Sequence, residues 1–231
     1  LIEAQLAALK KKNKKLLLHF EYVPPAHKDV EKKLLLSLCK HVDSMGLNET
    51  ELIEVLKMLG KHSEAEFLRK HESAYSICQG MRKLMAVTGL KRLQVHDLGF
   101  HTILLKKPYN AVSVEQVRDA CVYASFITSL KARLGLHFVS SKDVESAEPF
   151  TVSETGLNQI SIFESAIAKE LMTSRQVKHS SFDRRTYFAE GILELKDVFV
   201  IIVPSPIVPV PKLTVGLGDV FSSTFLAAER G

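Results

Sequence analysis

The amino-acid sequence predicts an α/β protein in which a mainly parallel central sheet is covered by helices. Short apolar runs without alternation, at residues 16–21 and 198–203, indicate strands that are buried on both faces. Segments with the apolar spacing of helices separate these runs, as expected where helices connect parallel strands. Ligands of such sheets bind beyond the carboxyl ends of the strands, so polar residues at those ends are the first candidates for a functional site.

The composition indicates a soluble, globular chain of one domain. The sequence has 231 residues, of which 46% are hydrophobic and 25% are charged. No apolar run approaches the ~20 residues that span a bilayer, and the lysine-ended first segment does not resemble a signal peptide. We therefore expect no membrane partner and a cytoplasmic location.

The cysteines support the same compartment. Cys39, Cys78 and Cys121 follow neither a disulfide framework nor the spacing of zinc ligands. Each lies in a helical pattern, which predicts small buried side chains in a reducing cytoplasm.

The chain is basic, with a net charge of +5 and a pI near 9.0, which suits an anionic ligand. Lysines at positions 10, 11, 12, 14 and 15 form one cluster. Lysines are favoured in the last turn of a helix, and no aromatic residues for base stacking are interleaved among these five. A solvated helix end therefore explains the cluster better than nucleic acid does, and we expect no nucleic-acid partner.

Apolar spacing predicts helices at residues 1–15, 29–44, 49–59, 63–87, 114–134, 159–172 and 220–229. Gly46 is expected to close the second helix and Gly135 the fifth, because glycine adopts the left-handed conformation in which many helices end. Asn48 and Glu51 have the spacing of a capping box at the start of the third helix. The long fourth segment is expected to break near Gly80, and residues 140–158 are expected to form a polar loop.

Further strands are predicted at residues 93–96 and 99–105, and residues 186–190 and 191–195 look like two arms of a hairpin. Residues 204–211 are rich in proline and cannot continue a central strand, because proline has no amide hydrogen to donate. This stiff, apolar loop is suited to one wall of a pocket for a flat aromatic ligand.

The sequence Gly216-Leu217-Gly218-Asp219 stands where this loop turns into the last helix. Glycines let the backbone approach a ligand closely, and the first amides of a helix bind anions. An aspartate beside such an anion hole can take a proton from an attacking hydroxyl, which is an arrangement for phosphoryl transfer. The alternative is an ordinary left-handed turn with a helix-capping aspartate.

Glu21 ends the predicted strand 16–21, and Asn48 and Glu51 lie further along at the predicted mouth of the sheet. Two carboxylates with an amide would hold a magnesium ion, largely through water, as magnesium prefers. The alternative is structural: Glu21 is then a solvated loop residue or a helix cap, and Asn48 and Glu51 only cap the helix at residues 49–59.

Two further pairs of residues support only weaker functional hypotheses. His96 and His101 bracket Gly99 without a third ligand at a suitable spacing, so we favour sheet-end or core histidines over metal ligands. Arg184 and Arg185 stand beside the predicted hairpin and could contact phosphate, although surface arginines are commoner.

Three motifs follow one another along the chain: His19-Phe20-Glu21, Asn48-Glu49-Thr50-Glu51 and Gly216-Leu217-Gly218-Asp219. They resemble the His-x-Glu, Asn-x-x-Glu and Gly-x-Gly-Asp motifs of the ADP-dependent sugar kinases, the ADP-dependent glucokinase and phosphofructokinase family within the ribokinase-like superfamily. Residues 96–100 and 203–205 resemble weaker landmarks of that family. In order and spacing the motifs cover nearly the whole chain.

The resemblance implies a set of catalytic roles. Asp219 would be the general base that activates the sugar hydroxyl, and the amides of Gly216, Leu217 and Gly218 would form the anion hole. Magnesium on the phosphates of ADP would be organised by two carboxylates with two supporting side chains, namely Glu21, Glu51, Asn48 and His19.

The resemblance also implies the substrates and the extent of the domain. ADP would be the phosphoryl donor, AMP a product, and glucose or fructose 6-phosphate the acceptor. The adenine site would be lined by Val203, Pro204, Ile207 and Val210. Members of the family are much longer, so residues 1–231 would be the nucleotide-binding large domain, the C-terminal part of a longer kinase whose small lid domain is largely absent here.

Two other functions stay open. An ATP-dependent ribokinase-like kinase would use the same base and anion hole, and nucleotide competition would distinguish it from the ADP-dependent enzyme. A non-catalytic fragment or binding module would keep the fold, with Asn48 and Glu51 as a helix cap only and Asp219 as a turn residue only.

Overall fold

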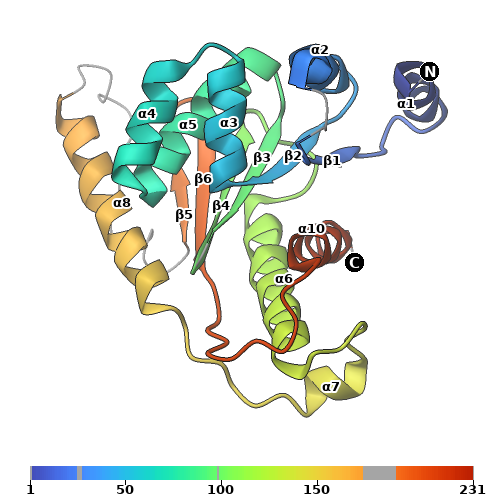
Figure 1. Cartoon of the computed structure of the whole chain (residues 1–231), viewed down its shortest axis with the longest axis vertical. Coiled ribbons are helices and arrows are strands. Elements are labelled where there is room, and N and C mark those ends of the chain that lie inside the picture. Colours follow the sequence, from blue (N-terminus) through green and yellow to red (C-terminus); the bar gives the residue numbers. More distant parts are fainter. Residues whose placement is uncertain (1, 25–27, 98, 174–190, 231) are drawn as a thin grey trace.

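The computed structural model describes residues 2–24, 28–97, 99–173 and 191–230 (Figure 1). The helices are α1 (Ile2–Lys12), α2 (Lys28–Leu38), α3 (Glu49–Met58), α4 (His62–His71), α5 (Ala74–Thr88), α6 (Val114–Leu134), α7 (Ser141–Glu145), α8 (Glu154–Thr173) and α10 (Leu217–Ala228). The strands are β1 (His19–Glu21), β2 (Ser44–Asn48), β3 (Arg92–Asp97), β4 (Phe100–Lys106), β5 (Ile192–Glu194) and β6 (Val198–Pro204). The predicted α/β class, with a sheet covered by helices, is confirmed.

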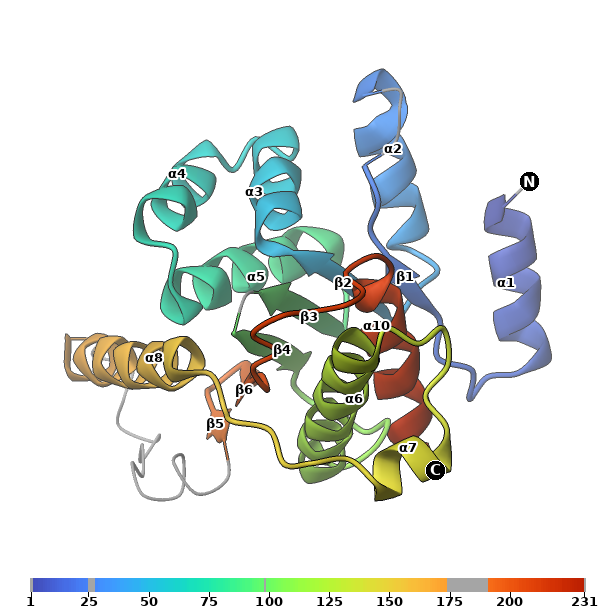
Figure 2. The same ribbon diagram turned by 60° about the horizontal axis from the view of Figure 1, so that its bottom comes forward.

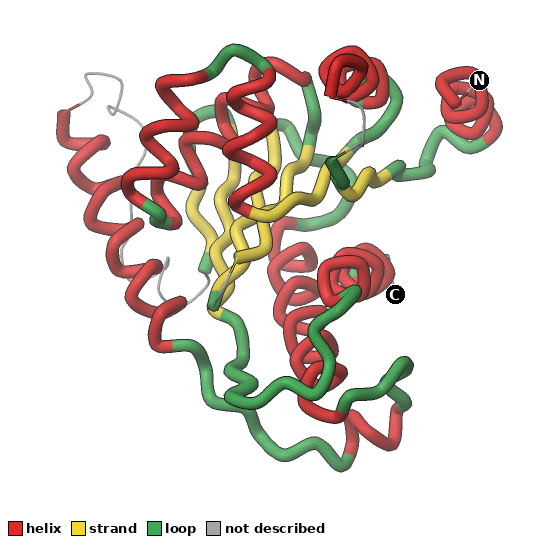
Figure 3. The backbone as a smooth tube through the Cα atoms, viewed as in Figure 1, coloured by secondary structure: helices red, strands yellow, loops and turns green. Residues whose placement is uncertain are grey.

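The strands of the described residues form one sheet in the order β1-β2-β3-β4-β6-β5 (Figure 3). The pairs β1–β2 and β2–β3 are parallel, whereas β3–β4, β4–β6 and β5–β6 are antiparallel. Strands β1, β2, β3 and β6 thus share one direction, but the sheet as a whole is mixed. The chain turns back between β3 and β4 at Gly99, whose φ of 97° suits only glycine, and so short a connection can join only antiparallel strands.

Helices cover both faces of the sheet. Figures 1 and 2 show α6 and α10 side by side on one face, and α3, α4, α5 and α8 on the other. Met45, Leu47 and Leu93 belong to the larger apolar core, on the side of α3 and α5. Ile103 and Phe225 belong to a second core beneath α6 and α10.

The side chains of β1, β2 and β3 alternate between these two faces, because successive side chains of a strand point in opposite directions. Their apolar residues enter the larger core. The alternate positions face α10 and carry polar side chains: His19, Glu21, Ser44, Arg92, Gln94 and His96. The prediction of unalternating buried runs is wrong for this half of the sheet.

The largest difference from the predicted elements is β2 (Ser44–Asn48). The sequence predicts the end of the helix at residues 29–44 here, with Gly46 closing it. Helix α2 stops at Leu38, and Gly46 lies within a buried strand instead of closing the helix. A Cβ atom at Gly46 would collide with the Glu21 carboxylate. The glycine is therefore needed because a side chain of the neighbouring strand lies over it.

The break in the predicted helix 63–87 is also displaced. It falls at Glu72, which has a φ of 37°, and Ser73 then caps α5. Gly80 lies within α5, where an added Cβ would lie 3.2 Å from a methyl carbon of Leu56 and 3.4 Å from one of Leu52. Here the glycine permits close packing of α5 on α3.

Three helices include residues that the sequence predicts as loop. Helix α7 lies within residues 140–158, and α8 starts at Glu154 because the Ser153 hydroxyl accepts a hydrogen bond from the Gly156 amide, 3.1 Å away. Helix α10 likewise starts at Leu217, three residues before the predicted start.

Several other predictions are confirmed. Helix α6 has the predicted bounds, and Gly135 ends it with a φ of 72°. Lys10, Lys11 and Lys12 form the last turn of α1. The three cysteines are buried and unpaired. Of the predicted hairpin, the second arm contains β5, which pairs with β6. Residues 186–190 lie outside the described residues, so the hairpin stays a prediction.

Within the described residues, no helix combines the length and the apolar character that a membrane crossing requires.

Candidate active site

The end of β1 and the length of β3 lie against α10, which runs in the opposite direction to β3. Three pairs of residues fix the helix on this strand: Gly218 with His96, Ser222 with Gln94, and Glu229 with Arg92. A Cβ atom at Gly218 would lie 3.3 Å from His96 Nε2, so glycine lets the first turn of the helix approach the strand closely.

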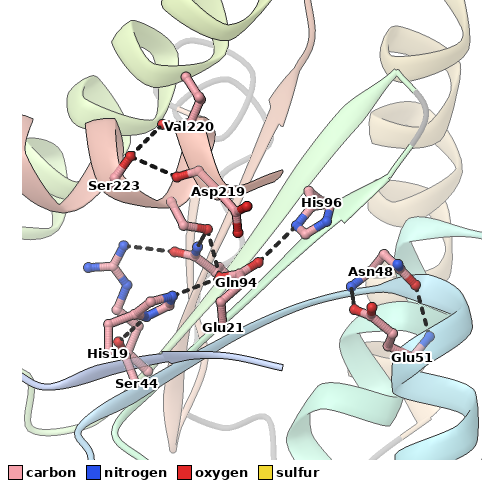
Figure 4. Close-up of polar contacts among 12 residues, drawn as sticks. His19, Glu21, Ser44, Asn48, Glu51, Gln94, His96, Asp219, Val220 and Ser223 are labelled. Carbon is pink, nitrogen blue, oxygen red and sulfur yellow. Dashed lines mark hydrogen bonds and ion pairs between the residues drawn. The ribbon is translucent and has the colours of Figure 1, made fainter. Parts of the chain in front are cut away.

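Glu21 is held by donors from two elements (Figure 4). Its Oε2 accepts hydrogen bonds from Ser222 Oγ at 2.8 Å and from His19 Nε2 at 2.9 Å. Its Oε1 lies 3.8 Å from His96 Nδ1. Because a carboxylate only accepts, the hydrogen of His19 is on Nε2, and His19 Nδ1 then accepts from Ser44 Oγ at 2.6 Å.

A line of buried polar side chains continues from Ser222 into the protein. Gln94 Nε2 donates to Ser222 Oγ at 2.6 Å, and Arg92 Nη2 donates to Gln94 Oε1 at 3.1 Å. Arg92 Nη1 also donates to Glu229 at 2.6 Å. All four residues are between 1% and 4% exposed. Buried polar groups are expensive unless hydrogen bonded, so this line determines where α10 can sit.

The first turn of α10 has the predicted position at the end of the proline-rich loop. Gly216 is the N-cap with a φ of 71°, and Leu217, Gly218 and Asp219 are the first three helical residues. Of the three amides predicted to bind an anion, Leu217 and Gly218 thus belong to the helix and Gly216 precedes it. The side chain of Asp219 is exposed, and it lies one turn before Ser222, the α10 residue that donates to Glu21.

A cleft of about 530 Å³ separates the N-terminus of α10 from that of α3. Leu217 and Gly218 line one side, and Asn48, Glu49 and Thr50 line the other. Two helix N-termini therefore face one cleft, an arrangement that attracts anions such as phosphate.

Glu49 brings a carboxyl group to the same cleft. One oxygen, Oε1, is buried without a hydrogen-bond partner within the described residues. Burial, followed by the carboxylates of Asp97 and Glu72, raises the pKa of Glu49 to about 7. An orphaned carboxylate oxygen with acidic neighbours suits a cation. No cluster of three or more His, Cys, Asp or Glu side chains forms a metal cage among the described residues, and magnesium bound through water and phosphate needs none.

The raised pKa of Glu49 predicts how stability depends on pH. Between about pH 4.5 and 7 the folded chain keeps the Glu49 proton while the unfolded chain has lost it, so the free energy of unfolding falls as pH rises through this window. We expect Glu49→Gln to be more stable than the parent at pH 8, by about 1 kcal/mol because Glu49 is half exposed, and equal to it at pH 4. Urea unfolding at both pH values measures this.

Glu54→Gln, an exposed change on the same helix, is the matched control and should leave the pH dependence as it is. An identical pH dependence in the parent and in Glu49→Gln would contradict the assignment of this titration to Glu49.

Asn48 and Glu51 form the capping box that the sequence predicts. Asn48 Oδ1 accepts from the Glu51 amide at 2.9 Å, and Glu51 Oε2 accepts from the Asn48 amide at 2.8 Å. In Figure 4 no drawn contact joins this pair to Glu21. One Glu51 oxygen is thus occupied by the cap, and the role of the pair toward magnesium stays a prediction.

The proline-rich loop is held by backbone contacts with the segment before α8. Ser153 N donates to Ser205 O at 2.9 Å, and Ile207 N donates to Thr151 O at 2.8 Å. The four residues predicted to line an adenine site differ in exposure: Val203 is buried in the second core, Pro204 and Ile207 are half-buried, and Val210 is 81% exposed. Their contact with a nucleotide stays a prediction.

The histidines lie where the sequence indicates, His96 at the end of β3 and His101 in the core. The His101 ring stacks on Phe221 at 4.0 Å, and its Nε2 lies 3.2 Å from Ser125 Oγ. Burial, with a smaller effect of His96, lowers the pKa of His101 to about 3, so the ring is neutral. Arg184 and Arg185 lie outside the described residues.

The comparison with family models decides the family. The model of the ADP-specific phosphofructokinase/glucokinase conserved region matches residues 1–228. The chain belongs to this family. The resemblance to the ADP-dependent sugar kinase family that the three motifs indicate is therefore confirmed.

Individual relatives of both kinds match at similar identity. The chain is 29% identical over 220 residues to the ADP-specific phosphofructokinase of Methanosarcina acetivorans, which covers 93% of this chain and 42% of the relative. It is 26% identical over 231 residues to the ADP-dependent glucose/glucosamine kinase of Pyrococcus furiosus, covering 99% and 45%. Relatives named for either kind of acceptor therefore match this chain about equally well.

A solved ADP-dependent kinase in complex with fructose-6-phosphate and ADPbetaS has the same fold, with a TM-score of 0.84 and 27% identity over 97% of this chain. The chain covers 46% of that structure. The chain thus spans less than half the length of these relatives.

Sequence reasoning missed Glu49 and the buried line Arg92, Gln94, Ser222 and Glu229. The signal for the line is present, since Arg92-Leu93-Gln94-Val95-His96 alternates strictly between polar and apolar residues, as in a strand with one polar face. Glu49 left no comparable signal, because the acidic groups that act on it, Asp97 and Glu72, come from other segments of the chain.

Proposed function

We propose that this chain is the nucleotide-binding large domain, residues 1–231, of an ADP-dependent sugar kinase. It transfers the β-phosphoryl group of Mg·ADP to a hexose or hexose phosphate, glucose or fructose 6-phosphate, and gives AMP. The observation that supports this best is the cleft between the N-termini of α3 and α10, because it combines two anion-attracting helix ends with carboxylates. The family membership supports the choice of ADP as donor.

Asp219 is the general base of this reaction. It is exposed in the first turn of α10, where it can accept the proton of an incoming sugar hydroxyl. The amides of Leu217 and Gly218, with the Gly216 N-cap before them, stabilise the charge on the transferred phosphoryl group. The base and the anion hole belong to the same helical turn, so both move with α10.

Magnesium fits two carboxylates at this site: Glu49 lines the cleft on the α3 side, and Glu21 lies next to His96, which also lines the cleft. Glu21 and Glu49 would hold it, largely through water, with Glu51 and Asn48 in support and His19 orienting Glu21. When bound, the ion neutralises the charge on the phosphates of ADP. Without it, the carboxylates would repel the nucleotide.

The adenine ring is placed against the loop that contains Val203, Pro204, Ile207 and Val210. Wherever a proline falls in this loop, no amide hydrogen is available, so contacts there are apolar. The buried, unpaired state of the cysteines supports a reducing compartment, such as the cytoplasm, for this function.

Calorimetric titration of the chain with ADP, ATP and AMP, with and without magnesium, tests the proposal. We expect ADP and AMP to bind in preference to ATP, and ADP binding to depend on magnesium. Glu21→Ala should raise the magnesium concentration needed for half-maximal ADP binding by about 10-fold or more, because it removes a carboxylate from the ion. Binding of AMP, which needs no ion, serves as the control.

Three results would contradict parts of this function. Preferential binding of ATP would favour an ATP-dependent ribokinase-like kinase. Binding of ADP that ignores both magnesium and Glu21 would remove the metal role of that carboxylate. A chain that binds no nucleotide would be a fragment that keeps the fold without the site.

A further inference from the structure

We propose that Ser222 and Gln94 are positioning residues that hold the Glu21 carboxylate at a fixed place relative to the first turn of α10. Glu21 stands on β1, whereas Ser222 stands on the helix that begins with the anion-binding amides and Asp219. The 2.8 Å hydrogen bond between them is therefore a direct link between the two halves of the proposed site. This inference rests on the proposed function, because the link has a chemical consequence only if Glu21 serves the metal.

The hydrogen bonds of this link all run in one direction. Arg92 can only donate, so Gln94 Oε1 accepts and the Gln94 amide group is turned to donate from Nε2. Ser222 Oγ accepts this bond, which leaves its single hydrogen for Glu21 Oε2. The line begins at a guanidinium cation and ends at a carboxylate, and such charge-assisted bonds are stronger than neutral ones.

Geometry leaves Glu21 few alternatives. The Glu21 carboxylate lies over Gly46 of β2, where any larger residue would displace it. Its Oε2 is used by both His19 and Ser222. The other oxygen, Oε1, accepts neither of these hydrogen bonds and is directed toward His96 at the edge of the cleft. The line thus selects which oxygen of Glu21 is available to a metal-bound water.

The polar groups of Ser222 and Gln94 are not needed for packing alone. Both residues are at least 96% buried, and apolar residues of the same size would fill the same space without forming directed hydrogen bonds. Alternation on β3 places Gln94 on the α10 face together with His96, and the α10 spacing places Ser222 one turn after Gly218. The hydrogen bond between Gln94 and Ser222 therefore depends on the position of α10 along β3.

The test is a double-mutant cycle on Ser222 and Glu21, read as the magnesium concentration at half-maximal ADP binding. Ser222→Ala alone should raise this concentration about 10-fold, the usual effect of losing a residue that orients a metal-binding carboxylate. In the Glu21→Ala background the same Ser222→Ala change should have no further effect, because the residue acts through Glu21. A merely structural serine would lower the midpoint of thermal unfolding equally in both backgrounds and would leave the magnesium dependence unchanged.

Ser223→Ala is the matched control. Ser223 is the next residue on α10, is exposed, and donates only to backbone oxygens of its own helix, the nearer being Asp219 O at 2.7 Å. This variant should keep the magnesium dependence of the parent. Gln94→Met, which retains volume and removes the donor to Ser222, is the second variant and should reproduce the Ser222→Ala shift in the same direction.

The outcomes separate the inference from the proposed function. If Glu21→Ala changes the magnesium dependence and Ser222→Ala and Gln94→Met do not, the positioning role is wrong and the function stands. If the parent chain shows no magnesium-dependent ADP binding, both are overturned. Additive effects of Ser222→Ala and Glu21→Ala would show that Ser222 acts by another route, and would also overturn the positioning role.

Discussion

Asp219→Asn is expected to reduce phosphoryl transfer by about 10²- to 10⁴-fold, the range associated with loss of a general base. The side chain is exposed in the first turn of α10, and asparagine keeps its shape without its ability to take a proton. Binding of ADP should change little, because the amides of Leu217 and Gly218 remain in place. AMP release with glucose and with fructose 6-phosphate as acceptors measures the rate, and calorimetry measures the binding.

Asp119→Asn is the control for loss of one surface carboxylate. Asp119 is exposed on α6 and pairs with Arg118, a contact of the kind that contributes little to stability. Its rate and its ADP affinity should equal those of the parent. An Asp219→Asn chain that releases AMP at the parent rate would remove the catalytic role of Asp219 and leave it a residue of the turn.

How much of the fold follows from the sequence depends on how local each signal is. The 21-residue helix α6 is predicted with its bounds, because its apolar stripe, its N-cap and Gly135 all lie within the segment itself. The strand β2 is missed because its central glycine reads locally as a helix end. The reason for Gly46 is the Glu21 side chain of another strand, and that contact is 25 residues away in sequence, beyond any local pattern.

The candidate site follows the same rule. Gly216, Gly218 and Asp219 lie within four consecutive residues, so their place near the start of a helix could be predicted from the local sequence alone. The capping box of Asn48 and Glu51 is equally local. The partners of Glu21 could not be predicted in this way, because Ser222 and Gln94 come from distant segments that meet only in the folded sheet. Pairings of this kind are set by topology, and the mixed order of the sheet was not predicted.

Glu229→Gln is expected to lower the free energy of unfolding by about 3–5 kcal/mol, because it leaves the Arg92 guanidinium buried without its counter-charge. Arg92 is 1% exposed and Glu229 is 3% exposed. Arg92 also lies 4.2 Å from the centre of the Phe225 ring, a contact that cannot replace an anion. Urea unfolding at neutral pH measures the loss. Arg69→Met, which breaks an exposed pair on α4, should cost less than about 1 kcal/mol.

The double variant Arg92→Met with Glu229→Leu separates stability from position. Burial raises the pKa of Glu229 in spite of the neighbouring guanidinium, so desolvation outweighs the attraction within this pair. Replacing both charges with apolar residues of similar size should therefore recover most of the stability that Glu229→Gln loses. The same double variant removes Arg92, the first donor of the line that ends at Glu21. The magnesium concentration at half-maximal ADP binding should therefore stay higher than in the parent, although the variant is stable. A double variant that recovers stability and magnesium dependence together would show that the buried charges only support the fold; recovery of stability alone would show that they also orient the site.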